Sequence, residues 1–268
     1  MDPAAAHAAR LAPYVEPHLA RRRAGTKHPI HDFLFQYYSY RPAQLMRWQP
    51  PGQLSTAKRP LVEAILKLLQ ATIDREGNFG CFGLHEWAMV YRAPRPRHPQ
   101  PLRLGHAETD KVVEGHRVTC SHWDAVRFFT APARPLNSLG PSSDDRPDFE
   151  QPACLHATMD LYKHAYRLAD VVGSDLVADA FELAWDVRIM DMRAAPYDMS
   201  GITIDPYGIE WTPIPIETAE GKREYARLQR EFAQRAAPVR ARLAEVLAGA
   251  LEPLRRGQRE GTSWVSRP

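Results

Sequence analysis

Three short segments of this sequence each place a histidine close to an acid, an aromatic residue and a cysteine. They are residues 85–87 (HEW), 122–124 (HWD) and 156–164 (HATMDLYKH), and Cys81, Cys120 and Cys154 precede them in turn. If the third segment is helical, His156, Asp160 and His164 share one face, because they recur at every fourth position. The residue types suit metal binding or acid–base chemistry.

Histidine and carboxylate side chains that converge from several helices form the transition-metal sites of helical proteins. We therefore predict His85, His122 and His156 as candidate ligands of a transition metal or a haem iron. Their spacing matches no standard zinc pattern. The alternative is that the cysteines are small buried hydrophobic residues and that the histidines beside them are ordinary core or surface groups.

Two carboxylates stand out as candidate catalytic groups. A carboxyl group beside apolar residues can serve as a general acid or base, because burial changes its affinity for a proton. Glu86 lies between His85 and Trp87, and Asp160 lies within an apolar helical stretch. We predict Glu86, Asp160 and His156 as catalytic residues. In the alternative, acids in the middle of a helix face solvent or pair with an arginine.

Aromatic and basic residues alternate in three stretches, near residues 37–48, 87–92 and 123–129. Aromatic faces stack on nucleobases and arginines hold phosphates, so this composition suits a pocket for an extruded base. Aromatic residues at helical spacing also form ordinary cores, and that alternative stays open. The substrate-binding candidates are Tyr37, Tyr38, Arg41, Trp87, Trp123 and Arg127.

The elements that must position these residues are interrupted by many prolines. The 24 prolines among 268 residues are about twice the usual 5%, which excludes a simple bundle of long helices. We predict a mainly α, single compact domain over residues 31–255, with short helices, long Pro-rich loops and a minor β hairpin around Gly208. Residues 1–30 are predicted as a basic N-terminal arm and residues 256–268 as a frayed C-terminal tail.

Helical periodicity is clearest in residues 61–73, 155–172 and 175–193, and shorter helices are predicted over 84–92 and 122–130. The sequence VVGSD before residue 176 provides a glycine stop and a serine cap. Residues 218–254 read as a long polar helix that Pro238 interrupts.

Composition and motifs exclude several classes. The formal net charge of +3 decides nothing about nucleic acid. Three cysteines without a CxxC pair argue against a secreted disulfide scaffold, and no apolar run is long enough for a signal peptide or a membrane span. We therefore expect a cytoplasmic protein without a membrane partner. Standard nucleotide, serine-hydrolase and zincin motifs are absent.

Several stretches resemble an actinobacterial family that carries the label 3-methyladenine DNA glycosylase. They are KHPIHDFLFQYYSYRPAQLMRW, CFGLHEWAMVY, RHPQPLRLG, CSHWDAVRFFT, QPACLHATMDLYK and DMRAAPYDM, within residues 27–238. The chain departs from the family at His164, where other members have tryptophan, and in residues 201–215. No catalytic motif of the family can be carried over to individual residues.

The resemblance implies hydrolysis of an N-glycosidic bond in DNA without a cofactor. An alkylated, cationic base leaves readily, so such an enzyme needs an aromatic pocket and a carboxylate that stabilises the developing positive charge on the sugar. Asp160 or Glu86 with His156 would fill that role. Two alternatives stay open: a metal- or haem-dependent enzyme that acts on a small molecule, and a non-enzymatic helical binding protein.

Overall fold

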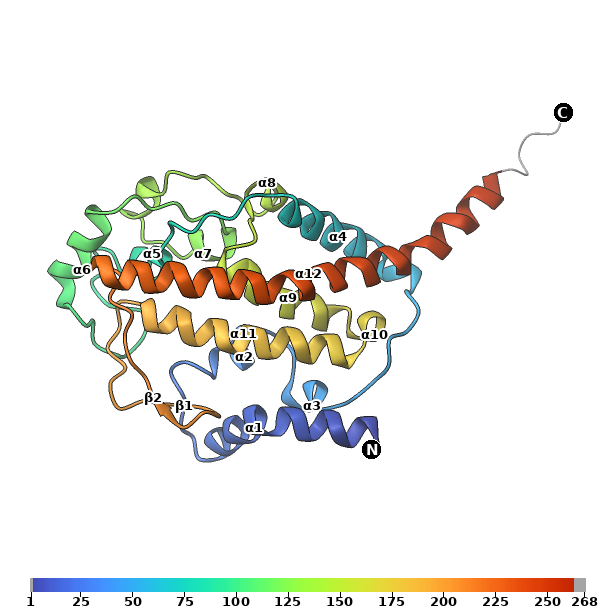
Figure 1. Cartoon of the computed structure of the whole chain (residues 1–268), viewed down its shortest axis with the longest axis horizontal. Helices are drawn as coiled ribbons and strands as arrows, with labels where there is room; N and C mark the ends of the chain where they lie inside the picture. Colours follow the sequence, from blue (N-terminus) through green and yellow to red (C-terminus); the bar gives the residue numbers. More distant parts are fainter. Residues whose placement is uncertain (1, 263–268) are drawn as a thin grey trace.

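Three helices from the second half of the chain pack against one another at the centre of the molecule: α9 (Leu155–Arg167), α11 (Ser174–Ala194) and α12 (Ala219–Thr262). The structure is a computed structural model that describes residues 2–262, with side chains up to residue 252. Figure 1 shows α11 alongside α12, with α1 (Pro3–Arg23) on its other side.

Shorter elements surround these helices. The remaining α-helices are α2 (Phe33–Gln36), α3 (Pro42–Leu45), α4 (Arg59–Ile73), α5 (Leu84–Ala88), α6 (Gly105–Glu114), α7 (Trp123–Val126), α8 (Arg146–Phe149) and α10 (Ala169–Val172). The described residues also contain two 3₁₀ helices, η1 (Thr56–Lys58) and η2 (Arg134–Leu136), and two strands, β1 (Thr203–Ile204) and β2 (Ile209–Glu210). The prediction of a single, mainly helical domain with a small hairpin is confirmed.

Helix α11 is the central element because it is buried on almost every side. A helix that is apolar all round belongs inside a protein, and α11 carries apolar side chains such as Phe181, Trp185 and Val187 with no exposed surface. It nevertheless buries two of its charged residues, Arg188 and Asp191, which are 2% and 1% exposed. Two buried charges on a central helix must find partners, and these partners lie in the site described below.

The junction between α10 and α11 differs from the predicted serine cap. Gly173 has φ of +81°, and a Cβ there would lie 2.8 Å from the Pro51 side chain, so glycine is required. The Ser174 side chain makes no cap hydrogen bond. Its hydroxyl donates to the Arg47 carbonyl and accepts the Gln49 amide. Ser174 therefore fixes the 47–51 loop to the end of α10.

Helix α12 continues through Pro238 instead of being interrupted there. Buried residues on one face of this helix recur at intervals of four or seven: Tyr225, Phe232, Ala236, Leu243, Leu247 and Leu251. This apolar stripe packs on α4, α9 and α11. The stabilisation gained by packing this stripe outweighs the loss of the one backbone hydrogen bond that a proline removes from a helix.

The N-terminal segment is a docked helix, so the prediction of a basic arm over residues 1–30 is corrected. Leu11 and Val15 of α1 have no exposed surface. His7 Nε2 lies 2.9 Å from the Leu45 carbonyl, and Arg10 pairs with Asp179 and Glu182 of α11. The basic run 21–23 occupies the last turn of α1, where cations favour the helix dipole.

Helix lengths and the C-terminus also differ from expectation. Helices α1 and α11 have 21 residues each and α12 has 44, so the expectation of short helices holds only for the other elements. Helix α12 runs through residues 256–262, where a frayed tail was expected; residues 263–268 lie outside the described residues.

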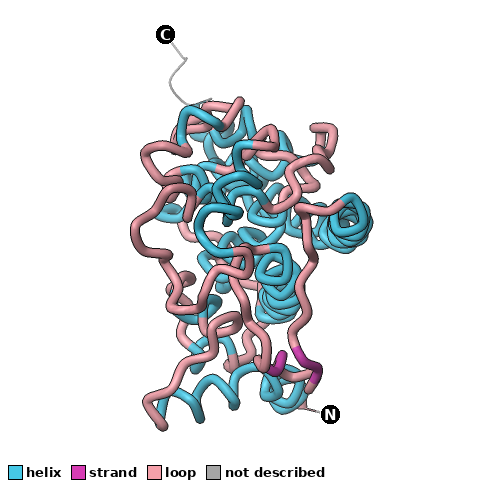
Figure 2. The backbone as a smooth tube through the Cα atoms, turned by 90° about the vertical axis from the view of Figure 1, so that its left-hand side faces the viewer, coloured by secondary structure: helices cyan, strands magenta, loops and turns pink. Residues whose placement is uncertain are grey.

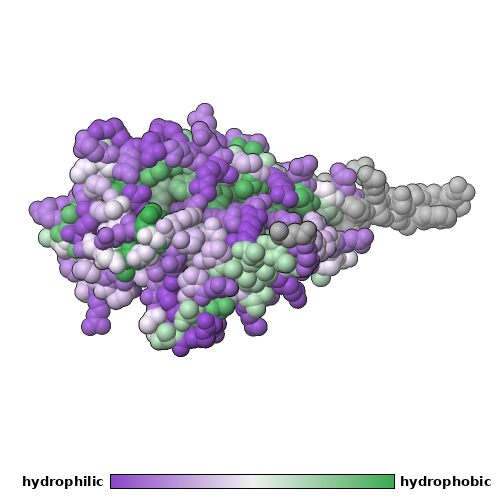
Figure 3. Space-filling view, turned by 60° about the horizontal axis from the view of Figure 1, so that its bottom comes forward, coloured by the Kyte–Doolittle hydropathy of each residue, from purple (hydrophilic) through white to green (hydrophobic). Residues whose placement is uncertain are grey.

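Loops and short helices gather at one end of the molecule, which faces the viewer in Figure 2. The face in Figure 3 is mainly hydrophilic, with hydrophobic residues in limited areas. No helix among the described residues combines the length and the apolar character that a membrane crossing needs.

Truncation of a buried α1 residue tests the docking of this helix. We expect Leu11→Ala to lower the free energy of unfolding by about 2–5 kcal/mol, because it leaves a cavity between α1 and the core. Denaturant unfolding measures the change, with Glu16→Ala on the exposed face of α1 as the control. A loosely attached arm would leave the stability of Leu11→Ala equal to that of the control.

Candidate functional site

A cavity of about 180 Å³ opens at the loop-rich end, where short helices meet α9 and α11. One part of its wall is aromatic and another holds carboxylates, histidines and arginines. The lining residues are Phe33, Tyr37, Tyr38, Glu86, Met89, Arg97, His98, His122, Asp124, Phe128, His156, Asp160 and Arg188. They come from five helices, from residues that flank these helices and from the Pro-rich loop 93–101, so only the tertiary fold assembles them.

Six of the residues singled out in the sequence line this cavity: Tyr37, Tyr38, Glu86, His122, His156 and Asp160. Arg127 is exposed beside it, and its guanidinium lies 3.5 Å from the Tyr37 hydroxyl. Trp123 and Arg41 are not among the lining residues. Trp87 has no exposed surface and donates its indole N–H to the Ala194 carbonyl. Trp87 is therefore a core residue, in line with the alternative that aromatic residues at helical spacing form an ordinary core.

Asp160 is the centre of a buried ion-pair network. Its Oδ2 accepts hydrogen bonds from Arg146 and from Lys163, each at 2.7 Å, and the Tyr38 hydroxyl lies 3.4 Å from Oδ1. Burial by itself would raise the pKa of this carboxyl, but the Lys163 charge and the His122 hydrogen bond hold the pKa well below its usual value. Asp160 is ionised, with most of its acceptor capacity in use.

The same network joins the segments around the cavity. Lys163 also reaches Asp124 of α7 at 2.8 Å. Arg146 of α8 pairs with Glu150, whose carboxylate lies 3.4 Å from His122 Nε2. The network therefore ties α7, α8 and α9 together beneath the cavity.

Glu86 has fewer partners. Its side chain is buried, and among the described residues its one ion-pair partner is Arg188, whose guanidinium lies 3.4 Å from Oε1. Arg188 is held more closely by Asp191 at 2.8 Å and lies over the Phe33 ring at 4.2 Å. Glu86 is therefore the cavity carboxylate with the most free acceptor capacity.

The three predicted histidines come together as a row. The His156 ring lies edge-on to His85, with 4.4 Å between ring centroids, and stacks on His122 at 5.4 Å. His85 Nε2 and Asp191 Oδ1 are 2.9 Å apart. Burial lowers the pKa of His85, but the Asp191 carboxylate outweighs it and the net pKa is raised. Burial, followed by the charge of His85, takes the pKa of His156 well below its usual value.

Sequence reasoning did not select Arg188 and Asp191, although both take part in the site. Their signal was present in residues 174–194, where acids and an arginine interrupt an otherwise apolar helix. A surface helix with the same pattern would turn these side chains to solvent. Only the burial of α11 on all sides shows that they face inward.

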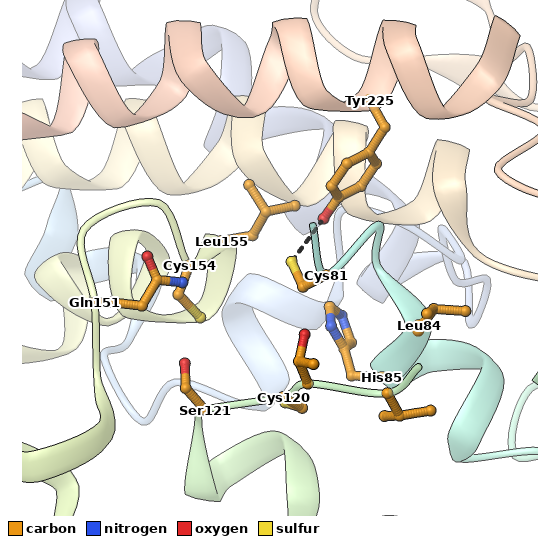
Figure 4. Close-up of a pocket in the computed structure, with 11 residues that line it drawn as sticks. Cys81, Leu84, His85, Cys120, Ser121, Gln151, Cys154, Leu155 and Tyr225 are labelled. Atoms are coloured by element: carbon orange, nitrogen blue, oxygen red, sulfur yellow. Dashed lines mark hydrogen bonds between the residues drawn. The ribbon is translucent and has the colours of Figure 1, made fainter. Parts of the chain in front are cut away.

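The three cysteines also converge, around a second cavity of about 20 Å³ next to His85 (Figure 4). Burial raises the pKa of all three thiols. Cys81 Sγ lies 3.3 Å from Gln229 Nε2 and 3.9 Å from the Tyr225 hydroxyl. In the described part of the chain, no group of three close ligand atoms includes a cysteine. Cys120 and Cys154 are buried, as the alternative of small buried hydrophobic residues predicted, whereas Cys81 is half-buried.

A second histidine group, formed by His28, His31 and Asp205, has a structural explanation. His28 Nδ1 accepts the backbone N–H groups of Ile30 and His31, and its Nε2 contacts the Thr203 carbonyl at 2.9 Å. His31 Nε2 accepts the Asp205 amide at 3.0 Å. These bonds attach the hairpin loop to the segment after α1. Burial, together with the neighbouring charges, lowers the pKa of His31 to about 2.

Comparison with known proteins yields no match to a family model, to a curated protein or to a solved structure.

Removing the charge of Asp160 tests its place in the network. We expect Asp160→Asn to lower the free energy of unfolding at pH 7 by about 3–5 kcal/mol, because Arg146 and Lys163 lose their buried partner. The unfolded carboxyl titrates near roughly pH 3.9 and the folded one lower. The stabilising contribution is therefore complete above that pH and is lost as the pH falls toward the folded pKa.

Denaturant unfolding between pH 7 and pH 2 measures this effect. The difference in the free energy of unfolding between the wild type and Asp160→Asn should become smaller below about pH 4. The exposed Asp74→Asn serves as the control and should stay within about 0.5 kcal/mol of wild type. If the two free energies of unfolding differed by the same amount down to pH 2, Asp160 would not be a carboxylate that is ionised and ion-paired in the folded state.

Proposed function

We propose that this chain is a hydrolase that cleaves the N-glycosidic bond of an alkylated purine in DNA. The observation that carries the proposal is the cavity itself, which is lined by aromatic rings and by a buried carboxylate with free acceptor capacity, Glu86. The resemblance to the glycosylase-labelled family supports the same chemistry.

The size of the cavity favours a single ring system as the bound group. Its volume of about 180 Å³ lies below the roughly 300–1,000 Å³ of pockets that hold drug-sized ligands. A base that has been turned out of a duplex is a flat group of suitable size, and enzymes that act on bases bind them in such pockets. Phe33, Tyr37, Tyr38 and Phe128 provide apolar and aromatic walls.

The charge of the cavity suits a cationic base. Glu86, Asp124 and Asp160 present carboxylates to its interior. Aromatic faces attract cations, so rings and carboxylates together favour an alkylated, positively charged purine over an unmodified one. The charge of Arg188, which also lines the cavity, is balanced by its closer contact with Asp191.

Two exposed arginines stand beside the aromatic wall. The guanidinium groups of Arg97 and Arg127 lie 4.2 Å and 4.5 Å from the centre of the Phe128 ring. Both residues are solvent-exposed. Arginines at the edge of a base pocket can hold the phosphates on either side of an extruded nucleotide.

In the proposed reaction the bond between the sugar C1′ and the base nitrogen breaks, and its electron pair goes to the base. The base is already cationic, so it leaves as a neutral molecule without a proton donor. The Glu86 carboxylate stabilises the positive charge that develops on the sugar. It then accepts a proton from the water whose oxygen bonds to C1′. Asp160 contributes by holding the cavity together and by its negative charge.

Release of free 3-methyladenine from alkylated duplex DNA, measured by chromatography, tests this function. We expect Glu86→Gln to slow the release on the order of 100-fold, because the amide cannot accept the proton or stabilise the cation as well. Glu63→Gln, exposed on α4, is the matched control and should release the base at the wild-type rate. Thermal unfolding of both variants shows that they are folded.

Two results would contradict the proposal. The first is that the wild-type protein releases no alkylated base from DNA. The second is that Glu86→Gln and Asp160→Asn both retain the wild-type rate, which would remove both carboxylates from the chemistry.

DNA binding by the cavity edge is tested by its dependence on salt. We expect Arg97→Ala and Arg127→Ala each to weaken binding and to reduce the slope of log K against log salt by about 1, because each arginine neutralises one phosphate. Fluorescence anisotropy with a labelled duplex measures the slope. Arg242→Ala on α12, which pairs with Asp179, should leave it unchanged. Equal slopes in the wild type and in all three variants would mean that DNA binds elsewhere on the protein.

A further inference from the structure

We propose that His85, His156 and Asp191 form a binding site for one divalent transition-metal ion of the zinc or ferrous class. Each residue offers one ligand atom, and these atoms all lie within 4.8 Å of one another. The three residues come from α5, α9 and α11, which are far apart in sequence. The set differs from the predicted His85, His122 and His156, because Asp191 takes the place of His122.

Two of the ligand atoms lie close to the spacing that an ion requires. Zinc binds histidine nitrogen and carboxylate oxygen at about 2.0–2.2 Å in tetrahedral geometry, so two such ligands on one ion lie about 3.3–3.6 Å apart. His85 Nε2 and Asp191 Oδ1 are separated by 2.9 Å. An ion would replace the proton between these atoms, and that proton would pass to solvent.

The orientation of Asp191 is fixed from outside the group. Arg188 donates a hydrogen bond to Oδ2 of Asp191 at 2.8 Å, while Oδ1 faces His85. Metal-binding carboxylates are commonly held in this way, with one oxygen bonded to a neighbouring donor and the other directed at the ion. Asp191 is 1% exposed and His85 is 6% exposed, whereas His156 is half-buried and lines the cavity, so an ion would be open to the cavity on the His156 side alone.

His156 provides an independent observation. Its Nδ1 is buried and has no hydrogen-bond partner among the described residues. Buried polar atoms are nearly always paired, and an unpaired one calls for an explanation such as an absent ion or water. His156 lies edge-on to His85, with 4.4 Å between the ring centroids, and its ligand atom is within 4.8 Å of those of His85 and Asp191.

The neighbouring candidates are less suitable. His122 Nε2 lies 3.4 Å from the Arg146 guanidinium as well as from Asp160 and Glu150, so a positive charge already occupies that side. In the group of His28, His31 and Asp205, both ring nitrogens of His28 and Nε2 of His31 are used in hydrogen bonds to the backbone. In both groups the candidate ligand atoms contact an arginine or the backbone, whereas His85 Nε2 and Asp191 Oδ1 bond to each other.

Metal binding to the full chain tests the proposal. Protein purified without chelator, stripped and then dialysed against Zn²⁺ or Co²⁺, is analysed by mass spectrometry of its metal content and by the visible absorption of Co²⁺. We expect one ion per chain. Asp191→Asn and His156→Ala should each raise the Kd for Zn²⁺ at least 10-fold, and the Co²⁺ spectrum should change in both.

Control variants separate this site from the other histidines. His122→Gln and His28→Gln should bind Zn²⁺ with the wild-type Kd, because neither residue is a ligand. Circular dichroism establishes the fold of each variant. If Asp191→Asn fails to fold because Arg188 loses its partner, His156→Ala decides, since no hydrogen bond from its ring is lost.

The proposal is overturned if wild-type protein binds no stoichiometric Zn²⁺ or Co²⁺, if His156→Ala binds as the wild type does, or if His122→Gln loses the ion. Base release in the same preparations is a separate measurement. Metal binding without base release would refute the proposed hydrolase activity and support the ion site. Base release without a bound ion would support the activity and refute the ion site.

Discussion

Burial of charged side chains among packed helices is the constraint on which this structure depends. An ionised carboxylate inside a protein is tolerated only with close partners. Asp160, 2% exposed, satisfies this requirement through Arg146 and Lys163. Arg146 stands on α8 and Lys163 on α9, and Lys163 also reaches Asp124 of α7. The position of one carboxylate therefore determines how α7, α8 and α9 meet.

Helix α11 imposes the same requirement from the opposite side. Arg188 and Asp191 are nearly inaccessible to solvent, and they satisfy each other while also reaching Glu86 and His85 of α5. The two sets of buried charges are separated by the cavity and by His156. The cavity therefore lies where two charge networks approach each other, which is why a small volume contains so many titratable groups.

The proline-rich loops fit this arrangement. Residues 93–101 bring Arg97 and His98 to the cavity, and residues 131–152 bring Arg146 and Glu150 beneath it. Proline restricts the backbone of a loop, so less conformational entropy is lost when the loop is held in place. Many helix-breaking residues are thus compatible with a well-defined site, provided that α9, α11 and α12 supply the core.

The sequence by itself determined the helical class, the existence of α9 and α11, the hairpin near Gly208 and the segments that hold Glu86, His122, His156 and Asp160. These features depend on local periodicity and residue type, which the chain carries in short windows. The docking of α1, the continuity of α12 through Pro238 and the roles of Arg188 and Asp191 were decided only by tertiary structure. Each depends on which face of a helix is buried, and that is settled by contacts between residues far apart in the chain, such as Arg10 with Glu182 or His85 with Asp191.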